Sequence, residues 1–162
     1  MSLHPIAHAV TRPDHPAIIM TGSGARMTYG ELDASSNRFA HLLHARGLGP
    51  NDRGGDAFAV LLENRLDYYV LNWGSQRAGT MLVPISTRLT GPEIAYILKD
   101  SEARLLITSP RFAEALETVR AQLPELEVLV LDSGGEDDFA AELDRHSEAP
   151  PENPHAGLIM LY

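Results

Sequence analysis

Hydrophobic residues follow two alternating patterns along the chain: short runs that are continuously apolar, and longer stretches in which apolar residues recur every three or four positions. The continuous runs lie at 57–62, 81–83, 105–107, 128–131 and 158–161. Strands of this kind are buried on both faces, as in a parallel sheet that helices cover on both sides. Two earlier stretches, 17–20 and 26–28, flank the turn sequence Thr21-Gly-Ser-Gly24 and predict a small β-hairpin.

The stretches between the runs carry helix signals at their beginnings. Thr28-Tyr-Gly-Glu31 and Thr90-Gly-Pro-Glu93 both fit a capping box, in which the threonine oxygen accepts a backbone N–H and the glutamate reaches back. Asn64 and the Ser109-Pro110 pair are predicted to begin two further helices. We therefore expect helices over 28–47, 64–79, 90–98 and 109–123, and a weaker one over 137–146.

This order of elements is that of an α/β domain with right-handed crossovers. We predict one domain over residues 1–162, with a doubly wound, mainly parallel sheet, helices on both of its faces and a small N-terminal hairpin. The proline-rich segment 147–154 is predicted to be an extended connector. Nothing polar follows the apolar run at 158–161, and we expect the sequence to be a piece of a longer protein.

The composition of the chain limits the classes of protein to which it can belong. The chain has 162 residues, 44% of them hydrophobic and 22% charged, which is typical of one globular domain. It has no cysteine, so disulfides, thiolate zinc sites and a cysteine nucleophile are excluded. The formal charge of −9 argues against nucleic acid or an anionic membrane as partner. Since the sequence shows neither a membrane span nor a secretion signal, we expect a cytoplasmic protein.

Histidines and aromatic residues are the first candidates for chemistry. Two histidine pairs, His4 with His8 and His41 with His44, have spacings that could share a helix face. Neither pair has an intervening glutamate or an evident third ligand, so we interpret them as surface histidines and predict no metal site. The aromatic residues on or beside one helix stripe are predicted to belong to the core or its flank: Tyr68, Tyr69 and Trp73.

Glycines, serines and the one lysine give no stronger signal. Gly22 and Gly24 lack the third glycine of a dinucleotide site, and Gly54-Gly55-Asp56 precedes a strand instead of joining a strand to a helix. Lys99 stands beside Asp100 and is predicted to form an ion pair. The serines that lack a neighbouring histidine in a nucleophile arrangement are Ser23, Ser86 and Ser101. We therefore predict no catalytic, cofactor-binding or metal-binding residue in this chain.

The order of the segments nevertheless resembles a known family. Thr28-Tyr-Gly-Glu-Leu32, Ala59-Val-Leu-Leu-Glu-Asn64, Ala78-Gly-Thr-Met-Leu-Val-Pro-Ile85 and the segment from Arg88 to Ser101 follow one another as in the beginning of acyl-CoA synthetases. These belong to the AMP-binding, adenylate-forming superfamily, and the chain looks most like the fatty-acyl and aryl-acid CoA ligases. The similarity covers nearly the whole chain, although no single motif in it is decisive.

The resemblance implies a two-step reaction, in which ATP and a carboxylic acid give an acyl-adenylate and coenzyme A then takes the acyl group. It also implies Mg²⁺ with the ATP. The family's phosphate loop follows an apolar strand like that at 157–162, so the resemblance places the nucleotide contacts beyond Tyr162. The chain would then be the N-terminal part of such an enzyme and inactive on its own.

Several alternatives stay open. An adenylation domain that loads a carrier-protein thiol would look the same over these residues, and so could a non-enzymatic α/β module that binds a partner. The uncovered last run predicts that the chain forms a homodimer or has a disordered end. One departure concerns Asn51-Asp-Arg53, where the family runs almost directly into the next strand. Here the segment from Gly54 to Phe58 adds residues and puts the register of that strand in doubt.

Overall fold

The computed structural model describes residues 5–134, 138–152 and 156–162. Its main sheet has five strands in the order β6-β5-β3-β4-β7, and every neighbouring pair is parallel. The strands are β3 (Ala57–Leu61), β4 (Met81–Pro84), β5 (Leu105–Thr108), β6 (Glu127–Val130) and β7 (Leu158–Ile159). A separate antiparallel hairpin joins β1 (Pro16–Ile19) to β2 (Arg26–Thr28). The prediction of a parallel sheet with an N-terminal hairpin is confirmed.

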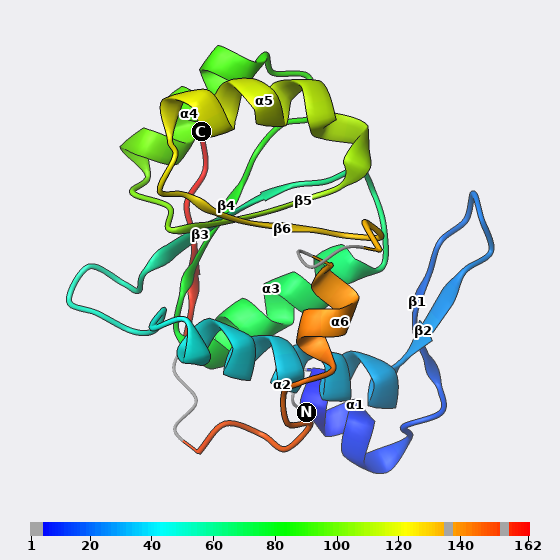
Figure 1. Ribbon diagram of the computed structural model, residues 1–162. Helices are drawn as coiled ribbons and strands as arrows, with labels where there is room; N and C mark the ends of the chain where they lie inside the picture. Colours follow the sequence, from blue (N-terminus) through cyan, green and yellow to red (C-terminus); the bar gives the residue numbers. More distant parts are fainter. Residues whose placement is uncertain (1–4, 135–137, 153–155) are drawn as a thin grey trace.

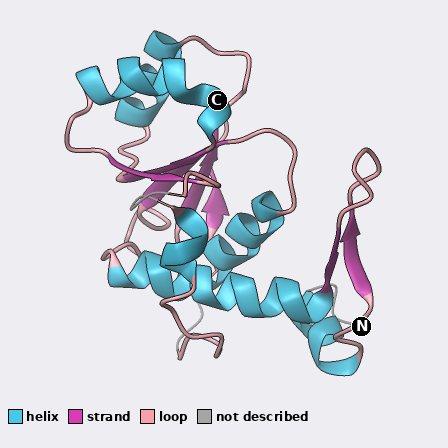
Figure 2. Cartoon of the chain, turned by 45° about the vertical axis from the view of Figure 1, so that its right-hand side comes forward, coloured by secondary structure: helices cyan, strands magenta, loops and turns pink. Residues whose placement is uncertain are grey.

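Helices cover both faces of the sheet (Figures 1 and 2). They are α1 (Pro5–Thr11), α2 (Tyr29–Ala45), α3 (Asp67–Ala78), α4 (Gly91–Asp100), α5 (Ala113–Gln122) and α6 (Phe139–Leu143), and a 3₁₀ turn at Pro110–Phe112 precedes α5. Successive residues of β3 enter different cores because side chains alternate across a strand. Phe58 and Val60 pack with α2, α3 and α6, whereas Ala59 and Leu61 pack with α4 and α5. The fold is therefore doubly wound, as predicted.

Two of the four predicted helix starts have the expected bonds. The Thr28 side chain accepts the Glu31 N–H at 3.2 Å, and Glu31 accepts the Thr28 N–H at 2.8 Å, which completes a capping box. At the start of α4, the Glu93 carboxylate accepts the N–H and the hydroxyl of Thr90 at 2.8 and 2.7 Å. In each helix the glutamate carboxylate thus accepts a backbone N–H that has no partner within the helix. Its negative charge is also favourable at the positive end of the helix dipole.

The other two starts were predicted wrongly. Asn64 does not cap α3: the helix begins at Asp67, after an Arg65–Asp67 ion pair of 2.6 Å, and no side chain caps it. Ser109 does not cap α5, because its hydroxyl donates to Glu63 instead and a 3₁₀ turn intervenes. Helix α1 was not predicted at all, and the helix expected over 137–146 is reduced to α6; residue 137 itself lies outside the described residues.

The added residues before β3 do not disturb the sheet. Ala57 lies opposite Met81 and Phe58 lies opposite Leu105, in regular parallel register. The extra length forms a turn in which Gly54 and Gly55 both have positive φ, at 100° and 114°. The doubt about the register of β3 is therefore removed, since the turn takes up the insertion before the strand begins.

Candidate functional site at the carboxyl edge of the sheet

The topology of the sheet defines one place where a ligand is expected. Ligands of open parallel sheets bind beyond the carboxyl ends of the strands, where neighbouring strands lead to opposite faces. Here β3 and β5 are neighbours, but the chain leaves them toward opposite faces of the sheet. Strand β3 leads into α3 on one face, and β5 leads into the 3₁₀ turn and α5 on the other face. The switch point of this sheet therefore lies between the residues that follow β3 and those that follow β5.

A hydrogen bond connects the residues that follow β3 to those that follow β5 at this switch point. The hydroxyl of Ser109, which is 2% exposed, donates to Oε2 of Glu63 over 2.7 Å. Burial by itself would raise the pKa of Glu63, but the bond from Ser109 and the charges of Arg65 and Arg111 outweigh it and lower the pKa. Glu63 is therefore an anion at neutral pH, and it joins the loops after two neighbouring strands.

Arg65 extends the same contact network to a third strand. Its guanidinium lies 2.6 Å from Asp67, 2.9 Å from Asp132 and 3.8 Å from Glu63. Although burial opposes the charge, Asp67 and Asp132 raise the pKa of Arg65. Asp132 follows β6 and holds its carboxylate there with a left-handed backbone, at φ 56°. Three carboxylates surround Arg65, so its guanidinium is already engaged. With Arg111 near Glu63, the site carries three negative and two positive charges.

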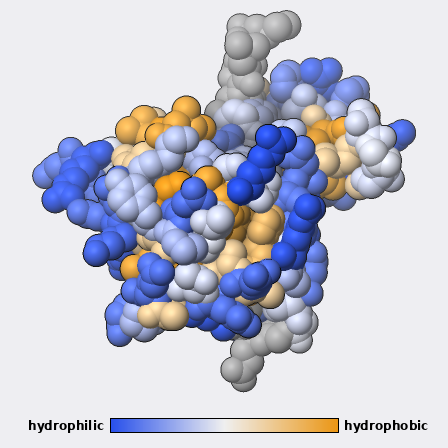
Figure 3. All heavy atoms as spheres, turned by 90° about the horizontal axis from the view of Figure 1, so that it is seen from above, coloured by the Kyte–Doolittle hydropathy of each residue, from blue (hydrophilic) through white to orange (hydrophobic). Residues whose placement is uncertain are grey.

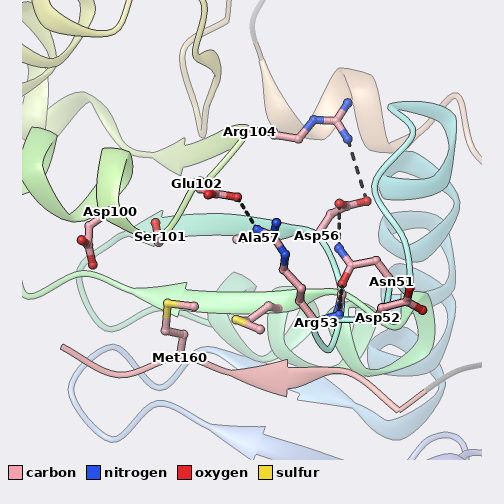
Figure 4. A pocket seen from close by; sticks show the side chains of 12 residues that line it. Asn51, Asp52, Arg53, Asp56, Ala57, Asp100, Ser101, Glu102, Arg104 and Met160 are labelled. Carbon is pink, nitrogen blue, oxygen red and sulfur yellow. Dashed lines mark hydrogen bonds and ion pairs between the residues drawn. The ribbon is translucent and has the colours of Figure 1, made fainter.

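A hollow lies at the opposite edge of the sheet (Figure 4). It has a volume of about 550 Å³ and lies beside the amino ends of β3 and β4. Its polar groups bond to one another. Asn51 Oδ1 accepts the N–H groups of Arg53 and Gly55 at 2.8 and 3.0 Å, and Asp56 accepts the N–H of Gly49 at 3.1 Å. These bonds build the turn before β3, so we interpret the hollow as a by-product of that turn.

The histidines singled out from the sequence do not converge. His8 Nδ1 lies 3.1 Å from Arg12 Nη2, and His4 lies outside the described residues. His41 Nε2 lies 2.9 Å from the carbonyl oxygen of Ala149, and His44 Nε2 lies 3.1 Å from that of Ala78. In the described part of the chain, no three histidine, aspartate or glutamate residues are grouped so that they could hold a metal ion.

The remaining candidates have local roles. The hydroxyls of Ser23, Ser86 and Ser101 bond to backbone groups within three residues. Asp100 accepts a hydrogen bond of 2.8 Å from the Tyr162 hydroxyl, and the described contacts contain no ion pair between Asp100 and Lys99, contrary to expectation. Gly22 and Gly24 lie in the hairpin turn.

The three aromatic residues on or beside the α3 stripe differ in burial. Tyr68 and Trp73 pack against the core, whereas Tyr69 is 43% exposed. The network of Glu63, Arg65, Ser109 and Asp132 was not predicted from the sequence. Its signal was available, because each of these polar residues comes within four positions of the end of a buried apolar run.

Sequence comparison assigns the chain to a class of protein that fits this fold. Residues 6–162 match the model of the AMP-binding enzyme family, and the chain belongs to that family. No described helix is both long enough and apolar enough to cross a membrane.

Particular relatives are similar over most of the chain. It is 38% identical over 148 residues to the fatty acid–[acyl-carrier-protein] ligase ScoC of Streptomyces coeruleorubidus, which is 91% of the chain and 26% of ScoC. It is 34% identical over 114 residues to the long-chain-fatty-acid–CoA ligase FadD13 of Mycobacterium tuberculosis, which is 70% of the chain and 22% of FadD13. The chain thus spans about a quarter of these relatives.

Solved structures agree with the sequence comparison. A Mycobacterium tuberculosis fatty acyl CoA synthetase superposes with a TM-score of 0.83 and 27% identity, over 98% of this chain and 31% of that one. The N-terminal domain of FACL13 from the same organism superposes with a TM-score of 0.78, over 92% of this chain and 37% of that one. The observed fold is therefore the fold of part of this family's enzymes.

Proposed function

We propose that the chain is the N-terminal part of an acyl-CoA synthetase, an ATP-dependent acid–thiol ligase that converts a carboxylic acid into its CoA thioester through an acyl-adenylate. The observation that carries the proposal is the family match over residues 6–162, joined to relatives named as fatty-acid ligases. In this proposal ATP, Mg²⁺ and coenzyme A serve the whole enzyme, which acts in the cytoplasm.

The described residues do not fit an ATP site by themselves. At the switch point, Arg65 is held by Asp67 and Asp132, and the surrounding charge is negative. A triphosphate would be repelled there, because like charges at close range disfavour each other strongly. We therefore propose that this chain acts as a scaffold, with the phosphate loop of the enzyme following β7 at the carboxyl edge.

Pyrophosphate exchange tests the proposal. The 162-residue chain and the product of the full open reading frame that contains it are each incubated with Mg²⁺, ATP, labelled pyrophosphate and a panel of aliphatic and aromatic acids. We expect acid-dependent exchange from the full product and none from the 162-residue chain. Exchange by the short chain that is abolished by heat would refute the scaffold role. A full product without exchange on any acid would instead favour the non-enzymatic module.

Calorimetry with Mg²⁺-ATP separates binding from turnover. The longer product is expected to bind ATP, and the 162-residue chain is expected to bind it weakly or not at all. Equal affinities would place a nucleotide site within these residues and contradict the scaffold role.

The acceptor thiol defines a second candidate function. ScoC is named a ligase for acyl-carrier protein, and the chain is also 34% identical over 149 residues to surfactin synthase subunit 2 of Bacillus subtilis. These names favour a carrier-protein thiol as the alternative to coenzyme A. Offering the active full product either coenzyme A or a phosphopantetheinylated carrier protein, and identifying the thioester by mass spectrometry, distinguishes the two.

We also propose that the 162-residue chain associates with a second copy. The observation in favour is the apolar, uncovered surface of β7, where Leu158 and Ile159 are each 50% exposed. Burying such a surface against its copy removes apolar area from water.

A further inference from the structure

The segment at residues 147–152, which we call the connector, leads from α6 toward β7 along the outer side of α2 (Figure 1). It lies on the side of the sheet away from α4 and α5, over which Figure 3 shows hydrophobic patches between hydrophilic regions. No helix or strand of the described chain includes the connector. Its path therefore depends on side chains that other elements supply.

Three side chains of α2 contact the connector. Asn37 Nδ2 donates to the carbonyl oxygen of Glu148 at 2.7 Å, and Arg38 lies 2.8 Å from the Glu148 carboxylate. His41 Nε2 lies 2.9 Å from the next carbonyl oxygen, that of Ala149. Two of these contacts are made to the backbone of the connector, so they fix the path of the chain itself.

Asn37 is held in turn by α3. It is 1% exposed, and its Oδ1 accepts a hydrogen bond from Nη1 of Arg77, which is 5% exposed. The same Nη1 donates to the Asp33 carbonyl oxygen at 2.9 Å, and Nη2 lies 2.6 Å from the Asp33 carboxylate. An arginine only donates hydrogen bonds, so the amide oxygen of Asn37 faces Arg77 and its nitrogen faces Glu148. One buried amide thus links α3 to the connector.

The end of α3 also holds the chain where it enters β7. The Gly157 N–H donates to Gln76 O at 3.2 Å, and the Leu158 N–H donates to Thr80 O at 3.0 Å. Gln76 directly precedes Arg77 in the sequence. The end of α3 therefore supports the chain on both sides of residues 153–155, which lie outside the described residues.

We propose that Asn37 is a positioning residue, which holds the connector against the α2–α3 layer and thereby places β7 beside β4. An amide offers an acceptor to Arg77 and a donor to the Glu148 carbonyl on one planar group, whereas an aspartate of the same size offers acceptors alone. In the proposed ligase the nucleotide loop follows β7, so for that loop the inference rests on the proposed function.

The size of the effect on β7 follows from two terms. A typical hydrogen bond within a protein corresponds to about a fivefold change in an equilibrium constant. Releasing the connector also lengthens the loop that ends at Gly157, from about 8 positions after Ala149 to about 14 after Leu143, which lowers the probability of closure about twofold. We therefore expect β7 to separate from β4 about two to five times more often in Asn37→Asp.

Amide hydrogen exchange of the 162-residue chain tests this expectation without reference to activity. In folded Asn37→Asp, the amides of Leu158 and Met160 should exchange about two to five times faster, while the amides of β5 keep their rates. Asn64→Asp introduces the same charge at an exposed position and should leave both sets unchanged. Unchanged rates at Leu158 and Met160, an equal acceleration in β5, or no protection of the two amides in the unmodified chain would each overturn the proposal.

A second variant keeps the test decisive if Asn37→Asp does not fold. His41 is partly exposed and contacts the carbonyl oxygen of Ala149, so His41→Ala weakens the hold on the connector without disturbing the buried Arg77 contacts. The same two amides should then exchange about twice as fast. Unchanged rates in His41→Ala would overturn the proposal in that case.

Pyrophosphate exchange by the full product tests the role toward the nucleotide. Asn37→Asp should raise the KM for Mg²⁺-ATP at least about threefold and leave the KM for the acid unchanged, because a displaced loop loses contacts with the nucleotide. A loss of folded enzyme would instead lower the rate without changing either KM. An unchanged KM for ATP in an active product would overturn this role. If the unmodified full product is inactive, the proposed function fails, and amide exchange still decides whether Asn37 holds β7.

Discussion

Replacing Gly55 by alanine would place a methyl group where the structure has no room for one. An added Cβ would lie 2.2 Å from the carbonyl oxygen of Gly79 and 2.9 Å from Cα of Thr80, and both are backbone atoms. Gly55 also has φ +114°, a conformation that side-chain-bearing residues rarely adopt. The turn before β3 and the start of β4 would have to move apart, although the Met81 N–H donates to Asp56 O at 2.9 Å across that contact.

The expected cost combines two independent effects. Backbone strain at such a φ costs about 1–3 kcal/mol, and forcing extra carbon into a packed site costs about 1–3 kcal/mol. We therefore expect Gly55→Ala to lower the free energy of unfolding by about 3–4 kcal/mol. Urea denaturation followed by circular dichroism, at a protein concentration where the chain is monomeric, measures the change.

Two other glycines of the chain separate the two effects. Gly24 has φ +72° and nothing within 4 Å of an added Cβ, so Gly24→Ala carries the strain alone and should cost about 1 kcal/mol. Gly22 has open space and no positive φ, and Gly22→Ala should change stability by less than about 0.5 kcal/mol. If Gly55→Ala costs no more than Gly24→Ala, the close approach between the turn and β4 does not exist in solution.

Two further predictions concern a helix cap and a partly buried histidine. Thr28→Ala removes the hydroxyl that accepts the Glu31 N–H and should lower the free energy of unfolding by about 1 kcal/mol; an unchanged urea midpoint would show that Thr28 is not a cap. Burial lowers the pKa of His146 below its ordinary 6.5, with Glu142 opposing this and Arg46 assisting it. The unfolded chain therefore takes up the proton first as pH falls, so the stability contributed by neutral His146 is present above pH 6.5 and is lost as pH falls through the lower folded-state pKa. Between pH 7 and 5, His146→Gln should lose stability less steeply than the unmodified chain, and parallel curves would contradict this prediction.

The fold was predictable because its signals are local and repeated. Runs such as 57–62 and 105–107 are continuously apolar, and the structure buries β3 and β5 completely between two helical layers. The Thr28 capping box lies within four residues of sequence, so its bonds could be inferred without the tertiary structure. Features of this kind are fixed by neighbours in the chain.

The failed predictions involve partners that are distant in the sequence. Ser109 has the sequence of a helix cap, but its hydroxyl bonds to Glu63, 46 residues away. Asn64 has the same signal, but the Arg65 ion pairs determine where α3 begins. The switch-point network was missed although its residues follow buried strands, because nothing local in the sequence shows that Glu63 and Asp132 share one arginine. A cap residue that follows a buried strand can bond across the sheet edge instead of within its own helix.

The order of the strands also determines how the sheet grows during synthesis. Strand β3 is central and is made first among the five, whereas β7 is at the edge and is made last. Ribosomes add roughly 5–20 residues per second, so the 28 positions from Val130 to Leu158 take roughly 1–6 seconds. Strand β7 can pair with β4 only after this interval, so β4 has no strand on its outer side until the end of the described chain has been made.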